Sequence, residues 1–160
     1  ICLTNSCCNE YMEGDTNMTK AVEESDKAVF ANLFKSFDRL NSEFSQVLKE
    51  FGISEPQFNA LRILRGAGEP LSCHEIGERM ITRVPDITRL LDRLEQRGLI
   101  ERRRSESDRR VIFVSITSDG RSLLRRLDRP VASFQRQRLA HLSEQERTQL
   151  ARLLGKLRQA

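Results

Sequence analysis

Hydrophobic residues recur at helical spacing along most of the chain. Between residues 28 and 51 they repeat every seven positions, in one row of phenylalanines and a second row three positions further on. The two rows are Phe30, Phe37, Phe44 and Phe51, and Leu33, Leu40 and Val47. Rows with this spacing share one face of a helix and form a seam for burial. The pattern predicts a long helix that ends at Gly52, with a seam that packs against the chain's own helices, a second subunit, or both.

Capping signals indicate three more helices. Each is a serine followed three residues later by Gln or Glu, side chains that can satisfy the free backbone N–H groups at a helix start. The three serines are Ser54, Ser72 and Ser143. We expect the helix that begins at Ser54 to stop at Gly66 and Gly68, and the helix that begins at Ser72 to be short and to end near Met80. The helix that begins at Ser143 carries a leucine stripe toward the C-terminal end.

Two further helices follow from the spacing of apolar residues. Within residues 85–98 they recur at i, i+3, i+4 and i+7 from Ile87, and Gly98 terminates the helix. Another long helix begins after Thr117, where Pro130 is a candidate kink. Between these two helices the period changes to that of strands.

Residues 99–104 and 111–116 predict two strands, joined by a polar hairpin loop at 105–110. In the second strand Ile112, Val114 and Ile116 share one face. The expected fold class is mainly α with a small β-hairpin (α+β). The element order is helix, helix, short helix, helix, hairpin, helix, helix.

The first 19 residues lack this pattern, and we expect them to be a disordered or non-native leader to a single domain over residues 20–160. Three of the four cysteines, Cys2, Cys7 and Cys8, lie in this leader, whereas a disulfide framework spreads its cysteines through the fold. The leader has neither the basic nor the apolar region of a signal peptide. No apolar run approaches the ~20 residues of a membrane span. A reducing cytoplasm is the expected compartment, with no membrane partner.

The charge is distributed unevenly. Residues 1–70 hold 7 Lys and Arg against 11 Asp and Glu, whereas residues 71–160 hold 20 against 12, and 19 of those 20 are Arg. An excess of arginine favours a polyanionic partner, for which nucleic acid is the first candidate. A salt-bridged helical surface has the same composition, so charge alone does not decide between the two.

A short helix, a tight turn, a second helix and a basic hairpin form the pattern of a winged helix-turn-helix. The second helix of such a pair enters the DNA major groove by its N-terminal half. Arg89 is the best candidate for a base edge, because a guanidinium can grip guanine O6 and N7 together. Thr88 and Arg93 suit phosphates, and Arg83 suits either. Pro85 and Asp86 lie on or beside the same outward face.

The loop between the two strands predicts a second contact, in a minor groove. An arginine at its tip, Arg109 or Arg110, suits the negative potential of a narrow minor groove. Asp108 makes little sense as a DNA contact, and we interpret it as a brace that aims an arginine.

Four stretches in this region resemble the MarR family of bacterial transcriptional regulators. They read DITRLLDRLE at 86–95, RGLIER at 97–102, DRR at 108–110 and ITSDG at 116–120. The match runs without a gap through residues 71–124, and the flanking helices agree in order and length over about 25–160. The resemblance implies a winged helix-turn-helix over about 53–117 and dimerisation helices over about 20–51 and 118–160.

The same resemblance implies a homodimer that binds a palindromic operator in double-stranded DNA, usually as a repressor. The first, fifth and sixth helices would form the dimer, with Phe30, Phe37, Leu150, Leu154 and Leu157 at the interface. Arg110 matches the family's wing arginine, and Asp108 the acidic residue that pairs with it. Many members release DNA on binding a small aromatic effector. Others sense oxidants through a cysteine in the first helix, but here no cysteine lies between Cys8 and Cys73.

Other functions have weaker signals. Cys73 opens a short helix whose dipole can activate a thiol, so a redox-responsive regulator is one alternative. Two histidines without metal-ligand spacing predict no metal site, and no cofactor is expected. The sequence has no phosphate loop or nucleophile elbow, so we expect no enzyme. The remaining alternative is a winged-helix adaptor without sequence-specific DNA binding.

Overall fold

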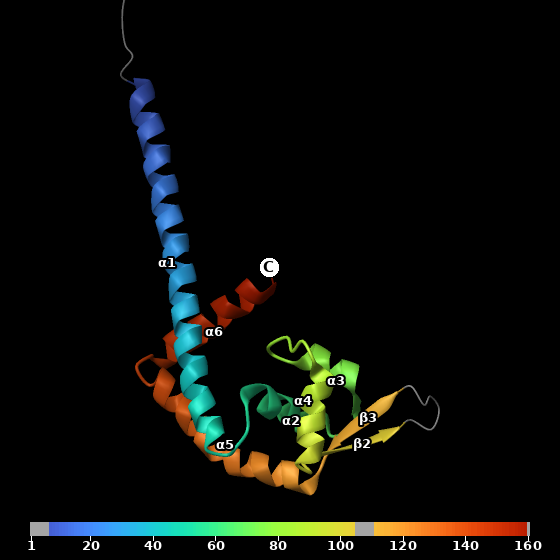
Figure 1. Cartoon of the computed structure of the whole chain (residues 1–160). Coiled ribbons are helices and arrows are strands. Elements are labelled where there is room, and N and C mark those ends of the chain that lie inside the picture. Colours follow the sequence, from blue (N-terminus) through green and yellow to red (C-terminus); the bar gives the residue numbers. More distant parts are fainter. Residues whose placement is uncertain (1–6, 105–110, 160) are drawn as a thin grey trace, which may run out of the picture. The chain divides into compact units, whose positions relative to one another are not determined.

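The computed structural model describes residues 7–104 and 111–159, with side chains from residue 23 onward. Contacts divide the chain into two units, residues 1–43 and 44–160. Helix α1 (Cys7–Lys49) begins in the first unit and ends in the second (Figure 1). It already includes residues 7–19, where the sequence predicts a disordered leader. That stretch holds no proline, and its single glycine, Gly14, weakens a helix by only about 1 kcal/mol.

The phenylalanine seam of α1 divides between the two units. In the first, Phe30 and Phe37 are exposed, and Phe30 stacks on Phe34 with ring centroids 6.4 Å apart. In the second, Phe44 and Phe51 are half-buried against the core. The Phe44 ring lies 5.7 Å from Phe58 and 5.5 Å from Phe134. The C-terminal part of the seam therefore packs against the chain's own helices, whereas the phenylalanines of the N-terminal part are exposed.

Two short helices follow, each with the predicted cap. Helix α2 (Glu55–Ala67) begins with the Ser54 capping box and ends at Gly68, which adopts the left-handed conformation at φ 72°. Helix α3 (Cys73–Arg79) begins at Ser72, whose hydroxyl accepts a hydrogen bond from the Glu75 backbone N–H at 3.2 Å. The two residues before it form a short strand, β1 (Leu71–Ser72), which the sequence does not predict because two residues carry no periodicity.

The pKa of the Glu75 carboxyl is lowered, because its charged form accepts a hydrogen bond first from the Ser72 backbone N–H and then from the Ser72 hydroxyl. A lowered carboxyl pKa contributes stability above the unfolded-state value, and that contribution is lost as the pH falls through the folded-state value. The cap of α3 is therefore intact at neutral pH.

The predicted hairpin is present as β2 (Ile100–Arg104) and β3 (Ile112–Ile116). The strands form an antiparallel sheet of order β1-β3-β2, in which Ile100 pairs with Ile116 and Leu71 with Val114. Helix α4 (Ile87–Gln96) precedes the hairpin. Gly98, with φ 67°, turns the chain between them. Helix α4 is therefore followed, after one tight turn, by β2, the first strand of the hairpin.

Two helices complete the chain. Helix α5 (Ser118–Leu139) begins at Thr117 and contains Pro130, and α6 (Glu144–Gln159) begins at the predicted Ser143 capping box. A single core joins the end of α1 with α2, α3, α4, α5 and the sheet. Helix α6 contributes no buried residue to it. None of the helices in the described parts of the chain combines the length and the apolar character needed to cross a membrane.

A tight joint fixes where the hairpin ends and α5 begins. The Thr117 hydroxyl donates a hydrogen bond to the Gly98 carbonyl at 2.7 Å, and the Thr117 backbone N–H donates to the Leu99 carbonyl at 3.2 Å. One turn further on, Gly120 faces the same Leu99 carbonyl. A Cβ at Gly120 would overlap that oxygen and lie 2.8 Å from Ile116 Cγ1. The position therefore accepts only glycine.

Substitution of Gly120 by alanine is expected to lower the free energy of unfolding by about 1–3 kcal/mol, because the backbone of Leu99 must move to admit a methyl group. The melting temperature should fall by roughly 2–4 °C for each kcal/mol. Gly66→Ala is the matched control, because a Cβ at this exposed helical position meets nothing within 4 Å. It should leave stability unchanged or raise it by up to about 1 kcal/mol. Equal effects of the two substitutions would contradict the packing described at Gly120.

Candidate nucleic-acid interface

Helix α4 has one buried face and one exposed face. Leu90, Leu91 and Leu94 are buried in the core, as the predicted stripe requires. The opposite side carries the polar residues, and Thr88, Arg89 and Arg93 are all exposed. The helix is therefore fixed by its leucines and free to meet a partner along its polar side.

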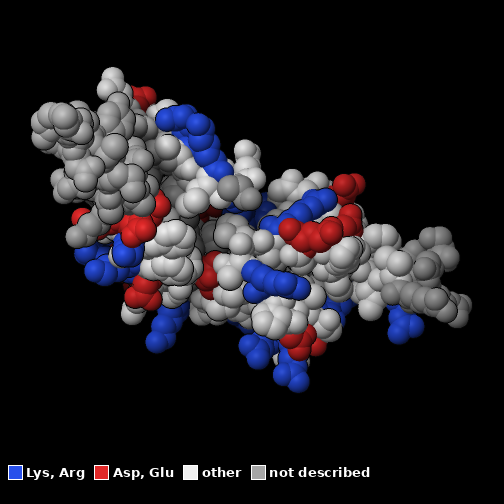
Figure 2. Space-filling view, turned by 90° about the horizontal axis from the view of Figure 1, so that it is seen from above, with Lys and Arg blue, Asp and Glu red and all other residues white. Residues whose placement is uncertain are grey.

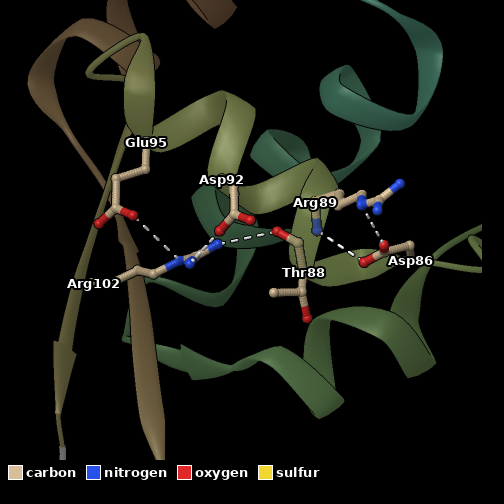
Figure 3. Close-up of polar contacts among 6 residues, drawn as sticks. All are labelled: Asp86, Thr88, Arg89, Asp92, Glu95 and Arg102. Carbon is tan, nitrogen blue, oxygen red and sulfur yellow. Dashed lines mark hydrogen bonds and ion pairs between the residues drawn. The ribbon is translucent and has the colours of Figure 1, made fainter.

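The N-terminal end of α4 is organised by Asp86. Its carboxylate is the N-cap of the helix and accepts a hydrogen bond from the Arg89 backbone N–H at 2.9 Å. The same carboxylate pairs with Arg89 Nε at 3.1 Å, while the Arg89 side chain stays 80% exposed (Figure 3). An exposed pair of this kind contributes at most about 1 kcal/mol, so the guanidinium can leave it for a stronger acceptor. Asp86, predicted as a DNA contact, thus has a capping role in the free protein.

The structure places several predicted residues on α4 or just before it. Arg83 and Pro85 are exposed in the segment that leads into it, and Thr88 and Arg93 lie on its outer side. Neither Arg83 nor Arg93 forms an ion pair with any residue that the structure describes. The predicted loop residues Asp108, Arg109 and Arg110 lie outside the described residues, so their roles remain predictions.

Arg102 on β2 is a site residue that the sequence reading missed. Its side chain is only 17% exposed, and its Nη1 donates a hydrogen bond to Asp92 Oδ1 at 2.6 Å. Its Nη2 donates to the Thr88 carbonyl at 3.2 Å. Its buried Nε lies 3.7 Å from Glu95 Oε2, close enough for charge attraction but beyond hydrogen-bond range. Figure 3 shows the guanidinium between these groups.

A signal for this arrangement was present in the sequence. Asp92 and Glu95 are three residues apart and so share one side of a helix. Side chains alternate along a strand, so at most every second arginine of the run 102–104 can face that helix. Periodicity does not reveal which arginine faces the helix. The burial pattern assigns that role to Arg102, whereas Arg103 is 78% exposed and pairs with Glu101 on its own strand.

Basic side chains alone do not outline the interface. On the face shown in Figure 2, acidic side chains lie beside basic ones among the described residues, without a continuous patch of one sign. The excess of arginine in residues 71–160 is partly taken up by ion pairs such as Arg102–Asp92, at 2.6 Å. Position on an exposed helix face therefore distinguishes the candidate DNA contacts better than charge does.

The structure gives little support to a redox site at Cys73 or to a metal site. Cys73 is a free thiol, partly buried, and packs against the core. His74 pairs with Glu78 along the exposed surface of α3, at 3.3 Å. Within the described residues, no three His, Cys, Asp or Glu side chains come together as they would around a metal ion.

Comparison with known proteins gives the family. The model of the MarR family matches residues 53–112, which span α2, α3, α4 and β2 and end at the first residue of β3. The HTH-type transcriptional repressor MdtR of Bacillus subtilis (strain 168) is 32% identical over 124 residues, covering 78% of this chain and 79% of that protein. The chain belongs to the MarR family.

Two further relatives are informative. The organic hydroperoxide resistance transcriptional regulator of Bacillus subtilis (strain 168) is 35% identical over 88 residues, which is 55% of this chain and 59% of that protein. The PcaV transcriptional regulator from Streptomyces coelicolor, solved in complex with its natural ligand, is 25% identical. Its TM-score is 0.67, over 77% of this chain and 89% of that one. MarR relatives are thus transcriptional regulators, and the winged-helix fold expected from the sequence is confirmed.

Replacing Arg89 by alanine should weaken binding of this MarR protein to its preferred duplex by about 1–3 kcal/mol and relax base preference at one position, if the guanidinium reads a base edge. Selection from a random duplex pool, followed by titration of the enriched sequence, measures both. Arg39→Ala is the control, because Arg39 is exposed and ion-paired with Glu43 but lies on α1. Weaker binding with an unchanged base preference would assign Arg89 to a phosphate instead.

Proposed function

We propose that the protein is a homodimeric repressor that binds an inverted-repeat operator in double-stranded DNA and is released by a small-molecule effector. The observation that carries the proposal is the orientation of α4. Its leucine face is buried, Thr88 and Arg89 are exposed in its first turn, and Arg83 is exposed in the segment that leads into it. A helix held in this way can insert into a major groove without moving its core contacts. The family supports the same role.

A dimer would present two such helices. Half-sites read by two helix-turn-helix units lie about 10 bp apart, one turn of DNA, so the operator should be an inverted repeat with that spacing. In this arrangement Arg109 and Arg110 would contact the flanking minor grooves, with Asp108 as the brace. The DNA would be met in the cytoplasm, where a bacterial regulator of this family acts.

Exposed apolar side chains support the homodimer. Helix α6 leaves Leu150, Leu153, Leu154 and Leu157 exposed along one face, and α1 leaves Phe30, Phe34 and Phe37 exposed. Single exposed apolar residues are ordinary, but a stripe along a whole helix is typical of a protein interface. A second copy of the chain is the proposed cover.

The effector is proposed to be a small aromatic compound such as a carboxylate or a phenol. The support is the MarR family itself and the relative PcaV, whose structure contains its natural ligand. Titration of benzoates and phenols into the protein–DNA complex tests this proposal. Failure of every compound to release the DNA would contradict it.

Redox control through Cys73 is the alternative form of regulation. One relative is named for organic hydroperoxide resistance. The position of Cys73 against the core favours a packing role for the thiol. Release of DNA by a hydroperoxide from the wild type, but not from Cys73→Ala, would establish the alternative.

Binding to a selected inverted repeat should fall steeply with salt. A protein that neutralises several phosphates loses affinity roughly in proportion to a high power of salt concentration. We expect about a 10³-fold or larger preference for the inverted repeat over an unrelated duplex. Fluorescence anisotropy between 50 and 200 mM salt, about the range over which such losses are large, measures both quantities. A duplex with one half-site scrambled is the control for two-fold recognition.

A winged-helix adaptor would behave differently in the same titration. It would show neither the steep salt dependence nor a preference for the repeat. That result would overturn the proposed function, and a scrambled half-site that binds as tightly as the intact repeat would overturn the dimeric mode.

Aspartate in place of Leu154 and Leu157 should convert the dimer to a monomer, because two charges would be buried in the proposed interface. Sedimentation equilibrium measures the change, and DNA affinity should fall with it. Thr148→Asp is the control, because it places one aspartate on the exposed opposite side of α6. A double variant that remains dimeric would remove α6 from the interface.

A further inference from the structure

Arg102 connects the hairpin to the candidate recognition helix at three points. Its guanidinium contacts Asp92 Oδ1 at 2.6 Å and the Thr88 carbonyl at 3.2 Å, and lies 3.7 Å from Glu95. These three residues follow one another at intervals of four and three, so they line one side of α4 over two turns. One side chain of β2 therefore contacts α4 along much of its length (Figure 3).

The same contacts change the charge of α4. The helix has two basic residues, Arg89 and Arg93, and two acidic residues, Asp92 and Glu95. Both acidic side chains pair with Arg102, and each remains 43% exposed. Two uncompensated carboxylates on a helix in a DNA groove would lie within a Debye length, about 8 Å, of phosphates and repel them. Arg102 carries one positive charge and so offsets part of that repulsion, although its side chain is only 17% exposed.

The geometry of the contact favours arginine. The planar fork of a guanidinium reaches two separate acceptors and still lies close to a third group, the Glu95 carboxylate, whereas the ammonium of lysine is a compact point charge. The backbone of Arg102 is also held in place, because Arg102 pairs with Val114 in the sheet and Val114 is fully buried. The position of the guanidinium is thus set by the strand and transmitted to the helix.

We propose that Arg102 is a positioning residue for DNA binding. It holds α4 at a fixed angle to the hairpin and offsets one of the two negative charges of Asp92 and Glu95, so that these carboxylates repel the phosphates less. This inference rests on the DNA-binding function proposed above. It differs from a direct phosphate contact, the role that a strand arginine near DNA would otherwise be given.

The test uses four variants of the full chain. Arg102→Gln removes the charge and the fork, and Arg102→Lys keeps the charge alone. A triple variant combines Arg102→Gln with Asp92→Asn and Glu95→Gln, so that no carboxylate is left unpaired. Arg103→Gln is the matched control, because Arg103 is the next residue of β2 but is exposed and pairs with Glu101.

Affinity is measured on the duplex that the wild type enriches from a random pool. Arg102→Gln should weaken binding about tenfold or more, and Arg102→Lys should lie between it and the wild type. The triple variant should recover to within about threefold of the wild type, as Arg103→Gln should, because the repulsive charges are gone. A triple variant as weak as Arg102→Gln would overturn the proposed charge compensation of Asp92 and Glu95.

Hydrogen exchange of the free protein separates this inference from the proposed function. Arg102→Gln should speed exchange of the α4 backbone amides several-fold, whereas Arg103→Gln should not. Unchanged exchange in α4 would overturn the positioning role even if DNA binding is confirmed. If the random pool yields no enriched duplex, the proposed function fails, and faster exchange in Arg102→Gln would still show that Arg102 holds the helix.

Discussion

The outward face of α4 depends on the burial of its inward face. Leu90, Leu91 and Leu94 are enclosed by the core that α2, α3, α5 and the sheet share. Burying such a side chain contributes about 1.5–3 kcal/mol, an upper estimate for each, so the three leucines fix the helix far more strongly than its surface ion pairs do. Because the stripe leaves only one rotation of the helix possible, it also decides which polar residues face outward.

Polar contacts then refine the orientation that the leucines set. Asp86 caps the N-terminal end, Arg102 holds one side from the hairpin, and the Arg97 guanidinium donates a hydrogen bond to the Gly52 carbonyl at 2.6 Å. Gly52 lies in the turn that follows α1, so the C-terminal end of α4 is tied to the segment leading out of that helix. Each contact is modest, but together they leave α4 little freedom to tilt.

Much of this arrangement could be predicted from the sequence, because it is encoded locally. The serine caps of α2, α3 and α6 and the leucine stripe of α4 are short-range patterns, and the structure confirms them. The strand β1 was missed because it exists only through pairing with β3. The partner of Asp92 was missed for a related reason, since it comes from a strand ten residues away whose facing side depends on the tertiary fold.

The phenylalanine seam shows the limit of periodicity in another way. The heptad pattern marks both halves of the seam equally, yet Phe44 and Phe51 pack against the core whereas Phe30 and Phe37 are exposed. Among the side chains of α1 from residue 23 onward, Leu48 is the most buried, and it stands outside both predicted rows. A repeat shows that a helix face is apolar, but what covers the face is decided by elements far along the chain.

The joint at Gly120 also limits how this protein can evolve. Any side chain there collides with the Leu99 carbonyl, so the position is closed to substitution however the DNA partner changes. Residues such as Arg83 and Arg93 have no partner among the described residues and can be exchanged without disturbing the fold. Descendants of this chain could therefore acquire new target sequences by changing the outer face of one helix, while the backbone that supports it stays the same.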